Sequence, residues 1–575
     1  MMDNMNAAVV GPKRVVRLYS ARRRAVLLLF LGASACDPAT SLPMGSDPES
    51  GKRREQVLPD DAVIVSATLP TSMRCGGSFA AAVTVQNRGT ATWTDSTFKL
   101  GTVDDSDPFY TSDTRVYLPP GTTVPPGGTY RFQFALTAPP TPGRYVTDWQ
   151  MVHEFVRWFG ATVKSDVVVT CPRTTVDAST LDRKLLFGYQ GWFSCPRDGT
   201  PIDGWVHWFR DNTASCGNLT VDLWPDVREL SSGEKCQTGM TLSDGSPAVV
   251  YSANRSQTVR RHFEWMRDAD LDGVMLQRFS SELRDPRFFA FRDQVARNVR
   301  DAAEATGRVF NIMYDVSGQP EATLVDDLKR DFTHLVDDLK LTDSPNYLRH
   351  KGRPVLVIWG LGYRDRPGTV AQAQELVRYF KTTAGASYQV TLVGGVPSGW
   401  RTLSGDSRSD AGWAAVYRSY DVLSPWSVGG FIDDAGADVW KRDRLTPDLA
   451  ETRRVGIGYM PVLWPGFSWR NLMGAASPSN QIPRRGGRFF WRQAYNAIGA
   501  GATTLFGAMF DEVDEGTAMF KLAETRSAQP VSCSLVPLNV DGEALPSDWY
   551  LRVGGEAGRM LRGEQALTAT LPIRP

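Results

Sequence analysis

Four acidic side chains occur within five residues near the carboxyl end of the chain, at Asp511, Glu512, Asp514 and Glu515. The residues before them, 507–510, predict a buried strand, and Glu512 and Glu515 stand three positions apart as the chain leaves it. Glycoside hydrolysis requires two carboxyl groups in different protonation states, one acting as acid and the other as base or nucleophile. Crowded like charges raise the pKa of at least one group, as a general acid requires, so the cluster predicts a catalytic pair.

Two structural interpretations of the same cluster remain open. Acidic side chains favour the N-terminus of a helix, so the cluster could cap a helix that follows the strand. Carboxylate oxygens are also the ligands that calcium prefers, so the cluster could bind that ion. In either case the acidic side chains would serve the fold rather than a reaction.

The elements that must position these carboxylates follow a regular alternation. From Leu181 onward, short β-branched apolar runs alternate with amphipathic stretches, the pattern of a parallel sheet with crossover helices. Strands are predicted at 184–193, 273–279, 309–315, 354–360, 389–396, 422–426, 455–465 and 503–510. Helices are predicted between them, for example at 257–270, 287–306, 321–341, 370–383 and 489–500, with a closing helix at 546–561. Residues 178–565 therefore predict an α/β domain with the fold of a (β/α)8 TIM barrel.

Working residues of such a barrel come from the carboxyl ends of its strands. Aromatic or hydrogen-bonding residues stand at most of these predicted ends, and we expect them to bind substrate: Tyr189, Trp192, Gln277, Arg278, Tyr314, Asp315, Trp359, Trp426, Trp464 and Asp511. Indole faces stack on the apolar faces of sugar rings, while polar groups hold the hydroxyls. The site is therefore predicted to bind a polysaccharide or other glycan.

The loop after the first predicted barrel strand is rich in aromatic and charged residues. We expect Trp205 and His207 to line the same cleft, and Trp224 is a further candidate. The alternative for His207 is a histidine that packs in the core with its hydrogen bonds satisfied.

Residues 61–171 predict a separate all-β domain. Alternating segments such as 79–86, 129–136 and 161–171 are separated by turns rich in Pro, Gly and Asn, at the spacing of a sandwich. The domain could bind glycan through its aromatic residues, or serve as a spacer whose aromatic residues form its core. The spacer interpretation is favoured.

The first 36 residues predict a targeting segment. Five arginines within 14–24 precede a short apolar run at 25–31 and small residues at 32–35, as in a secretory signal peptide. Residues 33–36, ending in Cys36, are typical of a bacterial lipobox and predict lipidation of Cys36 and a membrane-anchored lipoprotein. The alternative is a plain signal peptide cut near Ala35 and a secreted protein, and a twin-arginine signal is a weaker possibility. Residues 37–60 predict a flexible linker.

The remaining cysteines agree with an exported protein. Six cysteines, an even number, follow Cys36. Cys75 and Cys171 flank the all-β domain and are its only pair, so we expect a disulfide between them. A second bridge is expected among Cys195, Cys216 and Cys236, with its connectivity left open.

The composition argues against several other classes of protein. The net charge is +1, from 64 basic and 63 acidic residues, so no basic field is available to bind nucleic acid. A metal-dependent hydrolase is disfavoured because the chain has only five histidines. We expect neither a metal nor a cofactor.

The all-β segment resembles a known family. Residues 85–93, with Trp93, and the positions of Trp149 and Trp158 resemble the four-tryptophan Ig-like domain over nearly the whole segment. That resemblance implies an Ig-like β-sandwich, and the family's remaining tryptophan is not matched.

The barrel resembles glycoside hydrolase families 71 and 99, and more closely family 99. Residues 510–517, Phe-Asp-Glu-Val-Asp-Glu-Gly-Thr, stand where family 99 carries Phe-Asn-Glu-Trp-His-Glu-Gly-Thr. The family enzymes are endo-α-mannosidases that retain configuration without a protein nucleophile. The resemblance therefore implies that Glu512 is the base that deprotonates the sugar 2-hydroxyl. It implies that Glu515 is the acid that protonates the leaving oxygen and later the base that activates water.

Departures from the family pattern concern substrate recognition. The substrate-binding glutamate of the family's third strand is replaced by Met313, and the residues between the catalytic glutamates are Val513 and Asp514. Asp315, two positions after Met313, could supply the missing carboxylate. We therefore expect an exported glycosidase that acts on an α-linked glycan. The alternative is a non-catalytic lipoprotein that binds carbohydrate at the cell surface.

Overall fold

A computed structural model describes residues 58–575. These residues divide into two compact units between Cys171 and Pro172. The predicted targeting segment, the lipidated Cys36 and most of the 37–60 linker lie outside the described residues. The two units are described separately.

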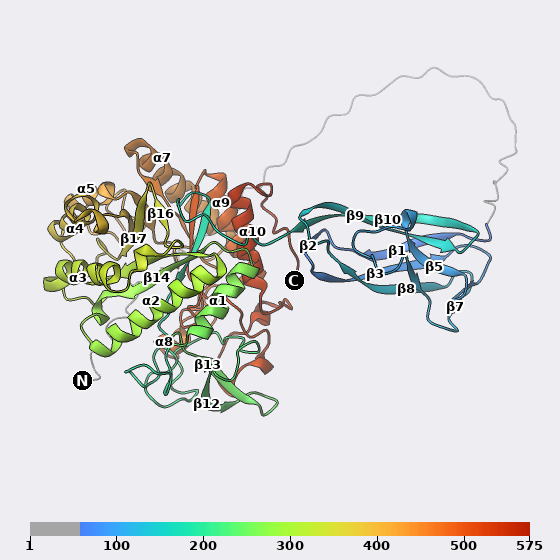
Figure 1. Cartoon of the computed structure of the whole chain (residues 1–575), viewed down its shortest axis with the longest axis horizontal. Coiled ribbons are helices and arrows are strands. Elements are labelled where there is room, and N and C mark those ends of the chain that lie inside the picture. The colour runs from blue at the N-terminus through green and yellow to red at the C-terminus, as the bar shows by residue number, and fades with distance from the viewer. Residues whose placement is uncertain (1–57) are drawn as a thin grey trace, which may run out of the picture. The chain divides into compact units, whose positions relative to one another are not determined.

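The first unit is a β-sandwich of two main sheets (Figure 1). The smaller sheet consists of β1 (Ala62–Thr68), β3 (Ser78–Asn87) and β8 (Thr129–Thr137), in the order β1-β3-β8. The larger follows the order β2-β10-β9-β5-β6, from β2 (Ser72–Arg74), β10 (Arg157–Thr170), β9 (Gly143–His153), β5 (Phe98–Thr102) and β6 (Arg115–Tyr117). A short pair joins β4 (Trp93–Thr94) to β7 (Thr123–Val124).

Aromatic side chains fill the sandwich core. Trp93 and Trp149 are fully buried, and the Trp149 indole donates to the Thr147 hydroxyl. Alternate residues of a half-buried strand face inward, which is why the polar and apolar residues of β8 and β9 alternate. These two tryptophans have no free face for a ligand, as the spacer interpretation expects. A disulfide joins Cys75 to Cys171, the pair expected from the sequence.

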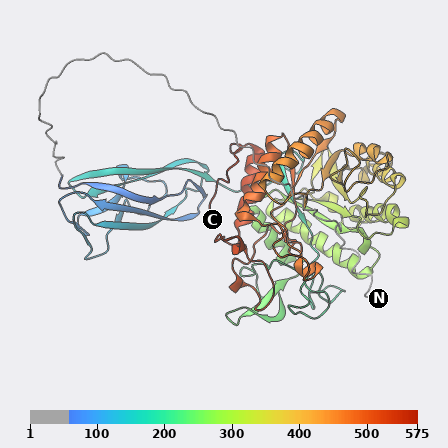
Figure 2. The ribbon, with the colours of Figure 1, turned by 180° about the vertical axis from the view of Figure 1, so that it is seen from behind.

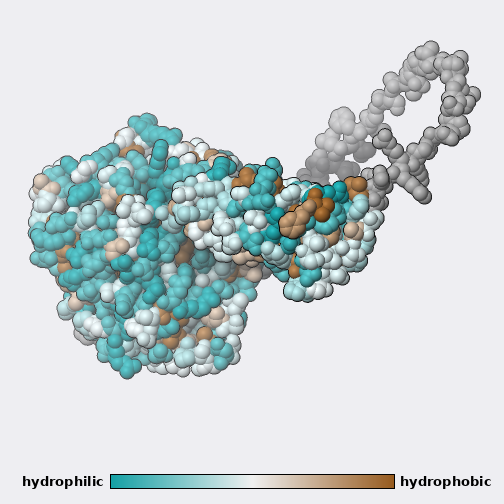
Figure 3. Space-filling model, turned by 45° about the vertical axis from the view of Figure 1, so that its right-hand side comes forward, coloured by the Kyte–Doolittle hydropathy of each residue, from teal (hydrophilic) through white to brown (hydrophobic). Residues whose placement is uncertain are grey.

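The surface of the sandwich also carries apolar side chains. Figure 3 shows brown, hydrophobic atoms among the hydrophilic ones on this unit. The exposed residues of this kind include Val65, Val146, Phe155 and Val156. Phe155 and Val156 stand at the turn between β9 and β10.

The second unit is built on a parallel sheet. Neighbouring strands follow the order β20-β19-β18-β17-β15-β14-β11-β22-β21. Their bounds are β11 (Lys184–Tyr189), β14 (Gly273–Phe279), β15 (Val309–Asp315), β17 (Arg353–Trp359), β18 (Thr391–Val396), β19 (Val422–Pro425), β20 (Gly458–Tyr459), β21 (Val462–Leu463) and β22 (Thr504–Gly507). The short β16 (Arg349–His350) pairs antiparallel with β17.

The sheet closes into a barrel through an interrupted seventh strand. β20 pairs with β19 and β21 pairs with β22, so the single strand predicted at 455–465 touches both neighbours in turn. The change occurs at Met460, whose N–H donates to the Leu423 carbonyl, and Pro461, whose carbonyl accepts from the Phe506 N–H. These bonds close an eight-stranded (β/α)8 barrel, as predicted. Proline suits the position where the strand changes its pairing partner, because it has no N–H to pair.

Helices surround the barrel (Figure 1). They are α1 (Ser256–Asp268), α2 (Pro286–Thr306), α3 (Leu324–Asp337), α4 (Val370–Arg378), α5 (Gly412–Ser419), α6 (Asp434–Trp440), α7 (Thr446–Val455), α8 (Arg470–Met473), α9 (Arg488–Gly499) and α10 (Trp549–Arg562). Local sequence sets their ends: Asp285 caps α2 by accepting from the Arg287 N–H, and Thr369 and Gln372 form a capping box on α4. Helices α9 and α10, orange to red, lie side by side in Figure 2.

A long insertion follows the first barrel strand. Residues 190–255 contain the hairpin β12 (Lys235–Thr241) and β13 (Pro247–Tyr251). One disulfide, Cys195–Cys236, lies within the insertion, so the expected second bridge is found. Another, Cys216–Cys533, ties the insertion to the long segment between β22 and α10.

Alternate strand residues face either the barrel interior or the helices. Met275, Met313, Val357 and Trp359 belong to an interior cluster. Their neighbours along the strands, such as Tyr314, belong to the larger core between sheet and helices. This alternation decides which strand-end residues can reach the interior site.

Two kinds of feature are absent from residues 58–575. No helix in this range has the length and apolar character needed to cross a bilayer. No group of three or more His, Cys, Asp or Glu side chains in the same range is arranged to hold a metal ion.

Candidate active site at the end of the eighth strand

The acidic cluster lies on a tight turn beyond the carboxyl end of β22. The Phe510 N–H donates to the Gly188 carbonyl of β11, and the Glu512 carbonyl accepts from the N–H groups of Thr517 and Ala518. Residues 513–516 form turns, and the next α-helix begins only at Trp549. The helix-capping interpretation of the cluster is therefore wrong.

Asp511 fixes the cluster to the first barrel strand. Its two carboxylate oxygens accept from the N–H groups of Gln190 and Gly191, at 2.7 and 3.0 Å, and the side chain is fully buried. Burial raises the pKa of Asp511 to about 7, while the two backbone donors act in the opposite direction. Asp511 was expected to bind substrate, but both its oxygens hold backbone, so it positions the turn.

Other backbone contacts fix the rest of the turn. The Val513 carbonyl accepts from the N–H groups of Asp222 and Leu223, and the Glu515 carbonyl accepts from the Ser468 N–H at 2.9 Å. The Asp222 carboxylate also accepts from the Ser468 hydroxyl and from the N–H groups of residues 470 and 471. The turn is thus held by the insertion after β11 and by the loop that contains Ser468 before any substrate arrives, which favours catalysis through preorganisation.

Glu512 is held at both oxygens. Its Oε1 accepts from the Gln190 side-chain amide at 2.5 Å, and its Oε2 lies 2.6 Å from the Thr517 hydroxyl. Burial, followed by the charges of Glu515 and Asp514, raises the pKa of Glu512 well above its ordinary value. The two donors oppose that rise because they stabilise the ionised form.

Glu515 differs from Glu512 in having no hydrogen-bond partner for its side chain among residues 58–575. It is also more exposed than the other three acidic residues. Burial raises the pKa of Glu515 to about 8, with a further rise from Asp514 and Asp315 and an opposing effect of Arg366. A carboxyl group that is accessible and protonated near neutral pH meets the requirements of a general acid.

Asp514 connects the cluster to the insertion after β11. Its Oδ2 lies 3.2 Å from Nδ1 of His207, whose ring stacks on Trp192 with centroids 3.7 Å apart. Burial raises the pKa of Asp514 to about 7 and lowers the pKa of His207 to about 3. His207 and Trp192 therefore form one wall beside the carboxylates, and both remain candidates for substrate binding.

Several polar atoms near this end of the barrel lack hydrogen-bond partners among the described residues. They include Gln277 Oε1, Trp359 Nε1 and Asp514 Oδ1. Buried polar atoms are rarely left unpaired, so such atoms at a strand end favour a bound polar ligand. The Trp359 ring meets Trp426 edge to face at 5.4 Å, and Trp426 is half-buried. Gln277, Trp359 and Trp426 remain candidates for substrate binding.

Met313 and Asp315 face the same side of β15. Met313 is packed in the interior cluster, and Asp315 ends the strand two residues later. Burial raises the pKa of Asp315, and its charge acts on Glu515. Asp315 thus contributes a carboxyl group to the electrostatics of the site.

Three strand-end candidates face away from the barrel interior. The Tyr189 hydroxyl lies 2.9 Å from Nδ1 of His262 on α1. Arg278 is paired with Asp293 and Asp331 on α2 and α3. The hydroxyl of Tyr314 donates to the same Asp331. The prediction that Tyr189, Arg278 and Tyr314 bind substrate is therefore wrong, because adjacent strand residues point to opposite faces.

Three tryptophans are also corrected. Trp464 is fully buried against Phe431 and Phe489, and Trp224 is only 1% exposed, so neither presents a face to a ligand. Trp205 lines a different cavity, within the insertion, that contains none of the four acidic residues. The prediction that Trp205 and Trp464 bind substrate at the carboxylates is wrong.

The sequence prediction omitted three residues that position the glutamates. Gln190 and Thr517 hold the Glu512 carboxyl, and Asp222 holds the turn. Gln190 could have been found, because it continues the interior face of β11 beyond Gly188. Asp222 lies almost 300 residues before the turn, and no local pattern connects the two.

Comparisons with known proteins give one family match, which covers the first unit. A family model described as an Ig-like domain from next to BRCA1 gene matches residues 54–169. A search of curated proteins gave no match.

Among solved structures, the chain is similar to the GH99 endo-alpha-mannosidase from Bacteroides thetaiotaomicron. The identity is 14%, the coverage is 67% of this chain and 100% of that chain, and the TM-score is 0.49. It is also similar to a glycoside hydrolase-like protein, with 13% identity, coverage of 59% and 93%, and a TM-score of 0.38. For a family 123 glycoside hydrolase from Clostridium perfringens the identity is 9%, the coverage 86% and 84%, and the TM-score 0.36. From its own strand pairing and the family match, the chain is an Ig-like domain followed by a (β/α)8 barrel with its carboxylates beyond β22.

Proposed function

We propose that the barrel is a glycoside hydrolase that acts on an α-linked glycan, with Glu512 and Glu515 as its catalytic pair. The observation that carries the proposal is the contrast between the two glutamates. Glu512 is held by donors at both oxygens, whereas Glu515 is accessible and has no hydrogen-bond partner among the described residues; burial raises the pKa of both carboxyl groups. Glycosidases need such a pair, with one group protonated and the other ionised.

The mutual repulsion of the pair supports the assignment of roles. Two neighbouring carboxyl groups do not readily ionise together. Glu512 and Glu515 therefore lose their first proton as a coupled pair and keep the second. The donors on Glu512 favour the negative charge there, and the proton stays on Glu515. In the first step Glu512 would remove the proton of the sugar 2-hydroxyl, whose oxygen attacks the anomeric carbon to give a 1,2-anhydro sugar, while Glu515 protonates the leaving oxygen. In the second step Glu515, now ionised, would activate a water that opens the anhydro ring at the anomeric carbon, and Glu512 would return its proton to the 2-oxygen.

Positioning of the sugar is assigned to the groups around the pair. Trp359 and Trp426 meet edge to face at the ends of β17 and β19, and an indole face there would stack on a sugar ring. Gln277 Oε1 and Trp359 Nε1, both without hydrogen-bond partners among residues 58–575, would accept from and donate to hydroxyl groups. Asp514 and His207 would limit the space beside Glu515.

We also propose that the protein is exported and anchored to a membrane through a lipid on Cys36. The basic, apolar and small-residue segments before Cys36 support this. The three disulfides support it as well, because such bonds persist in oxidising compartments. Metabolic labelling with a fatty acid, compared between the wild type and Cys36→Ala, tests the anchor. Equal labelling of both would refute it.

Hydrolysis is tested with purified protein lacking residues 1–36 against α-mannans, α-glucans and other plant and bacterial glycans. We expect Glu512→Gln and Glu515→Gln to reduce turnover by roughly 10²–10⁴-fold. Glu375→Gln, on the outer surface of α4, is the matched control and should retain full activity. Activity that survives Glu515→Gln would exclude Glu515 as the acid.

The alternative is a barrel that binds glycan without cleaving it. The observation in its favour is Met313, which stands where the resembling family has a substrate-binding glutamate. Retention on a glycan column, without hydrolysis of any glycan in the screen, would favour this alternative over the glycosidase.

A further inference from the structure

A second cavity lies within the insertion after β11, apart from the carboxylate pair. Its volume is about 520 Å³, within the range of about 300–1,000 Å³ typical of small-molecule sites. It is lined by Arg197, Lys235 and Arg255, and no acidic residue lines it. The half-buried indole of Trp205 lines it too, with the side chains of Asn212 and Gln237.

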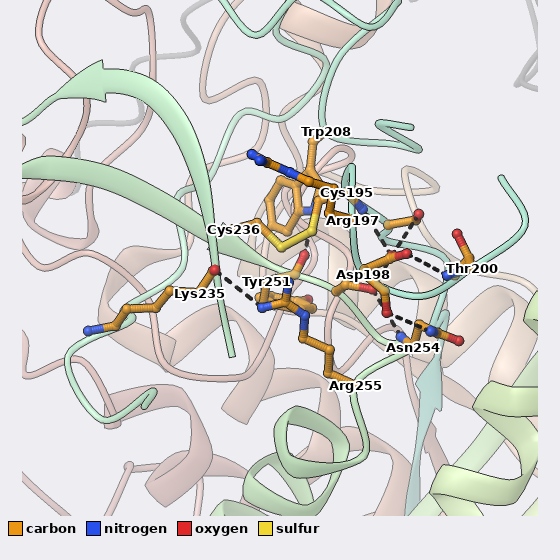
Figure 4. The surroundings of a disulfide bond; sticks show 12 residues. Cys195, Arg197, Asp198, Thr200, Trp208, Lys235, Cys236, Tyr251, Asn254 and Arg255 are labelled. Atoms are coloured by element: carbon orange, nitrogen blue, oxygen red, sulfur yellow. Dashed lines mark hydrogen bonds between the residues drawn. A yellow bond between two sulfur atoms is a disulfide. The ribbon is translucent and has the colours of Figure 1, made fainter. Parts of the chain in front are cut away.

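The loop that carries Arg197 is tightly organised around a buried aspartate. The Asp198 carboxylate accepts from the Cys195 and Thr200 N–H groups and from the Ser252 hydroxyl (Figure 4). The Cys195–Cys236 disulfide joins this loop to β12, which begins at Lys235. These bonds fix the backbone under two of the three cations.

The third cation is fixed by hydrogen bonds to backbone. The Arg255 guanidinium donates to the carbonyls of Gly233 and Lys235, at 2.6 and 3.2 Å. Figure 4 shows the three residues near the disulfide, with the side chains of Arg197 and Lys235 extending in different directions. No carboxylate within residues 58–575 forms an ion pair with any of them, although most arginines of the barrel are paired. A cavity with three such cations attracts an anion.

The indole and the amides specify the rest of the ligand. An indole stacks on the apolar face of a sugar ring, and amide groups bind hydroxyls. Trp205 stands two residues before His207, which contacts Asp514 of the carboxylate cluster. Two residues span at most about 7 Å of backbone, so the chain leads directly from one wall of the cavity to the residue that contacts Asp514.

We infer that this cavity is a binding site for an acidic saccharide, whose carboxylate or sulfate groups pair with Arg197, Lys235 and Arg255 along its lining. The identification of the ligand as a saccharide rests on the proposed function, whereas its negative charge rests on the cavity alone. The site assigns acidic glycans as the substrate class to be preferred. Its location in the insertion makes it an additional site beside the reacting sugar.

Binding is measured by calorimetry with the full-length protein and three oligosaccharides of equal length: an oligogalacturonate, a chondroitin sulfate fragment and a neutral maltooligosaccharide. We expect at least one acidic probe to bind and the neutral one to bind about ten-fold more weakly or not at all. Carboxylate binding alone, sulfate binding alone and binding of both all support the inference and identify the group. Equal binding of the neutral probe overturns it.

The test variant is Arg197→Gln combined with Lys235→Gln, which leaves the backbone bonds of Arg255 in place. We expect affinity for the acidic probe to fall about ten-fold or more. The control combines Arg287→Gln with Arg442→Gln, which removes the same charge from exposed positions elsewhere on the barrel. An equal loss in both variants would mean non-specific attraction and would overturn the inference.

The result of this binding test can be distinguished from the result of the hydrolysis test under the proposed function. Binding is measured without turnover, so an inactive barrel that binds the acidic probe through Arg197 and Lys235 refutes the hydrolase and supports the cavity. An active barrel that shows no preference for acidic probes supports the hydrolase and overturns the inference about the cavity. Binding of inorganic sulfate, with no binding of any oligosaccharide, overturns the saccharide assignment.

Discussion

The side-chain amide of Gln190, beyond β11, donates to Oε1 of Glu512, beyond β22, across 2.5 Å. Because an amide N–H can only donate, this bond favours the ionised form of Glu512 and opposes the rise of its pKa. The two residues lie 322 positions apart and meet only because the barrel closes. The residue beyond the neighbouring strand therefore supplies one of the two hydrogen bonds that oppose the rise in the pKa of Glu512.

Replacement of Gln190 tests this relationship. In Gln190→Leu the pKa of Glu512 should rise, so the acid limb of the kcat/KM profile should move to higher pH, with a loss of about 10–100-fold at neutral pH. The profile is measured between pH 4 and 9. Gln389→Leu, at the opposite end of a barrel strand, is the control and should leave the profile unchanged. An unchanged acid limb in Gln190→Leu would show that the hydrogen bond from Gln190 to Glu512 does not contribute to catalysis.

Removal of the Asp514 charge should stabilise the protein at neutral and alkaline pH but not at pH 4. The pKa of Asp514 in the folded protein is raised to about 7 from an ordinary 3.8, so the folded state binds the proton more tightly than the unfolded chain. Stability from this group is complete below pH 4 and is lost as the pH rises toward 7. Asp514→Asn should therefore melt roughly 2 to 4 °C higher than the wild type at pH 8, and at the same temperature at pH 4.

Thermal melts at the two pH values check this expectation. Asp301→Asn, at an exposed position of α2, serves as the control and should not change the difference between them. Equal effects of Asp514→Asn at pH 4 and pH 8 would refute the assignment of the shift to burial of the charged form.

Gly516 should tolerate no side chain. It adopts φ +69°, and an added Cβ would lie 2.7 Å from the Ser468 backbone nitrogen, which holds the Glu515 carbonyl. Gly516→Ala should displace Glu515 and lower kcat by about 100-fold, since small displacements of catalytic groups are costly. Gly542→Ala has the same left-handed backbone, φ +87°, with nothing near its Cβ, and should cost only stability of about 1 kcal/mol. Similar kinetics of the two variants would show that the contact with Ser468 is not important.

The Cys216–Cys533 disulfide should support the site from outside the barrel. It closes a loop of 317 residues and fixes the insertion to the segment that follows the acidic turn. The double Ser variant should lose about 2–4 kcal/mol and part of its activity. The matched variant at Cys75 and Cys171 should destabilise the sandwich and leave hydrolysis by the barrel unchanged. Unfolding in denaturant and initial rates provide the measurements, and full activity of the first variant would contradict the expectation.

Much of the barrel could be predicted because its strands are fully buried. β14 and β15 occur at the predicted bounds, and the disulfide of the sandwich joins the only two cysteines of that domain. The interruption of the seventh strand was not predicted, because pairing with two partners in turn depends on the closure of the sheet. The apolar run at 455–465 has the same pattern with or without the break.

The site was predicted less completely, for two physical reasons. Listing Gln277 and Arg278 together ignored the alternation of strand faces, which sends the first inward and the second toward α2 and α3. The tryptophans at the strand ends differ in burial: Trp426 is half-buried, whereas Trp464 is fully buried. Burial of a large side chain depends on partners far away in the sequence, so composition at a strand end could not distinguish them.

The change of pairing partner at Met460 and Pro461, within the seventh strand, also affects how copies of the protein can associate. An open edge strand presents unpaired N–H and C=O groups on which another chain can add a strand. Within the described residues, β19 is paired through β20 and β22 through β21, so neither strand is left as an open edge. Within residues 58–575 the barrel sheet itself therefore offers no edge on which another copy could add a strand, and a single proline-containing break provides that closure.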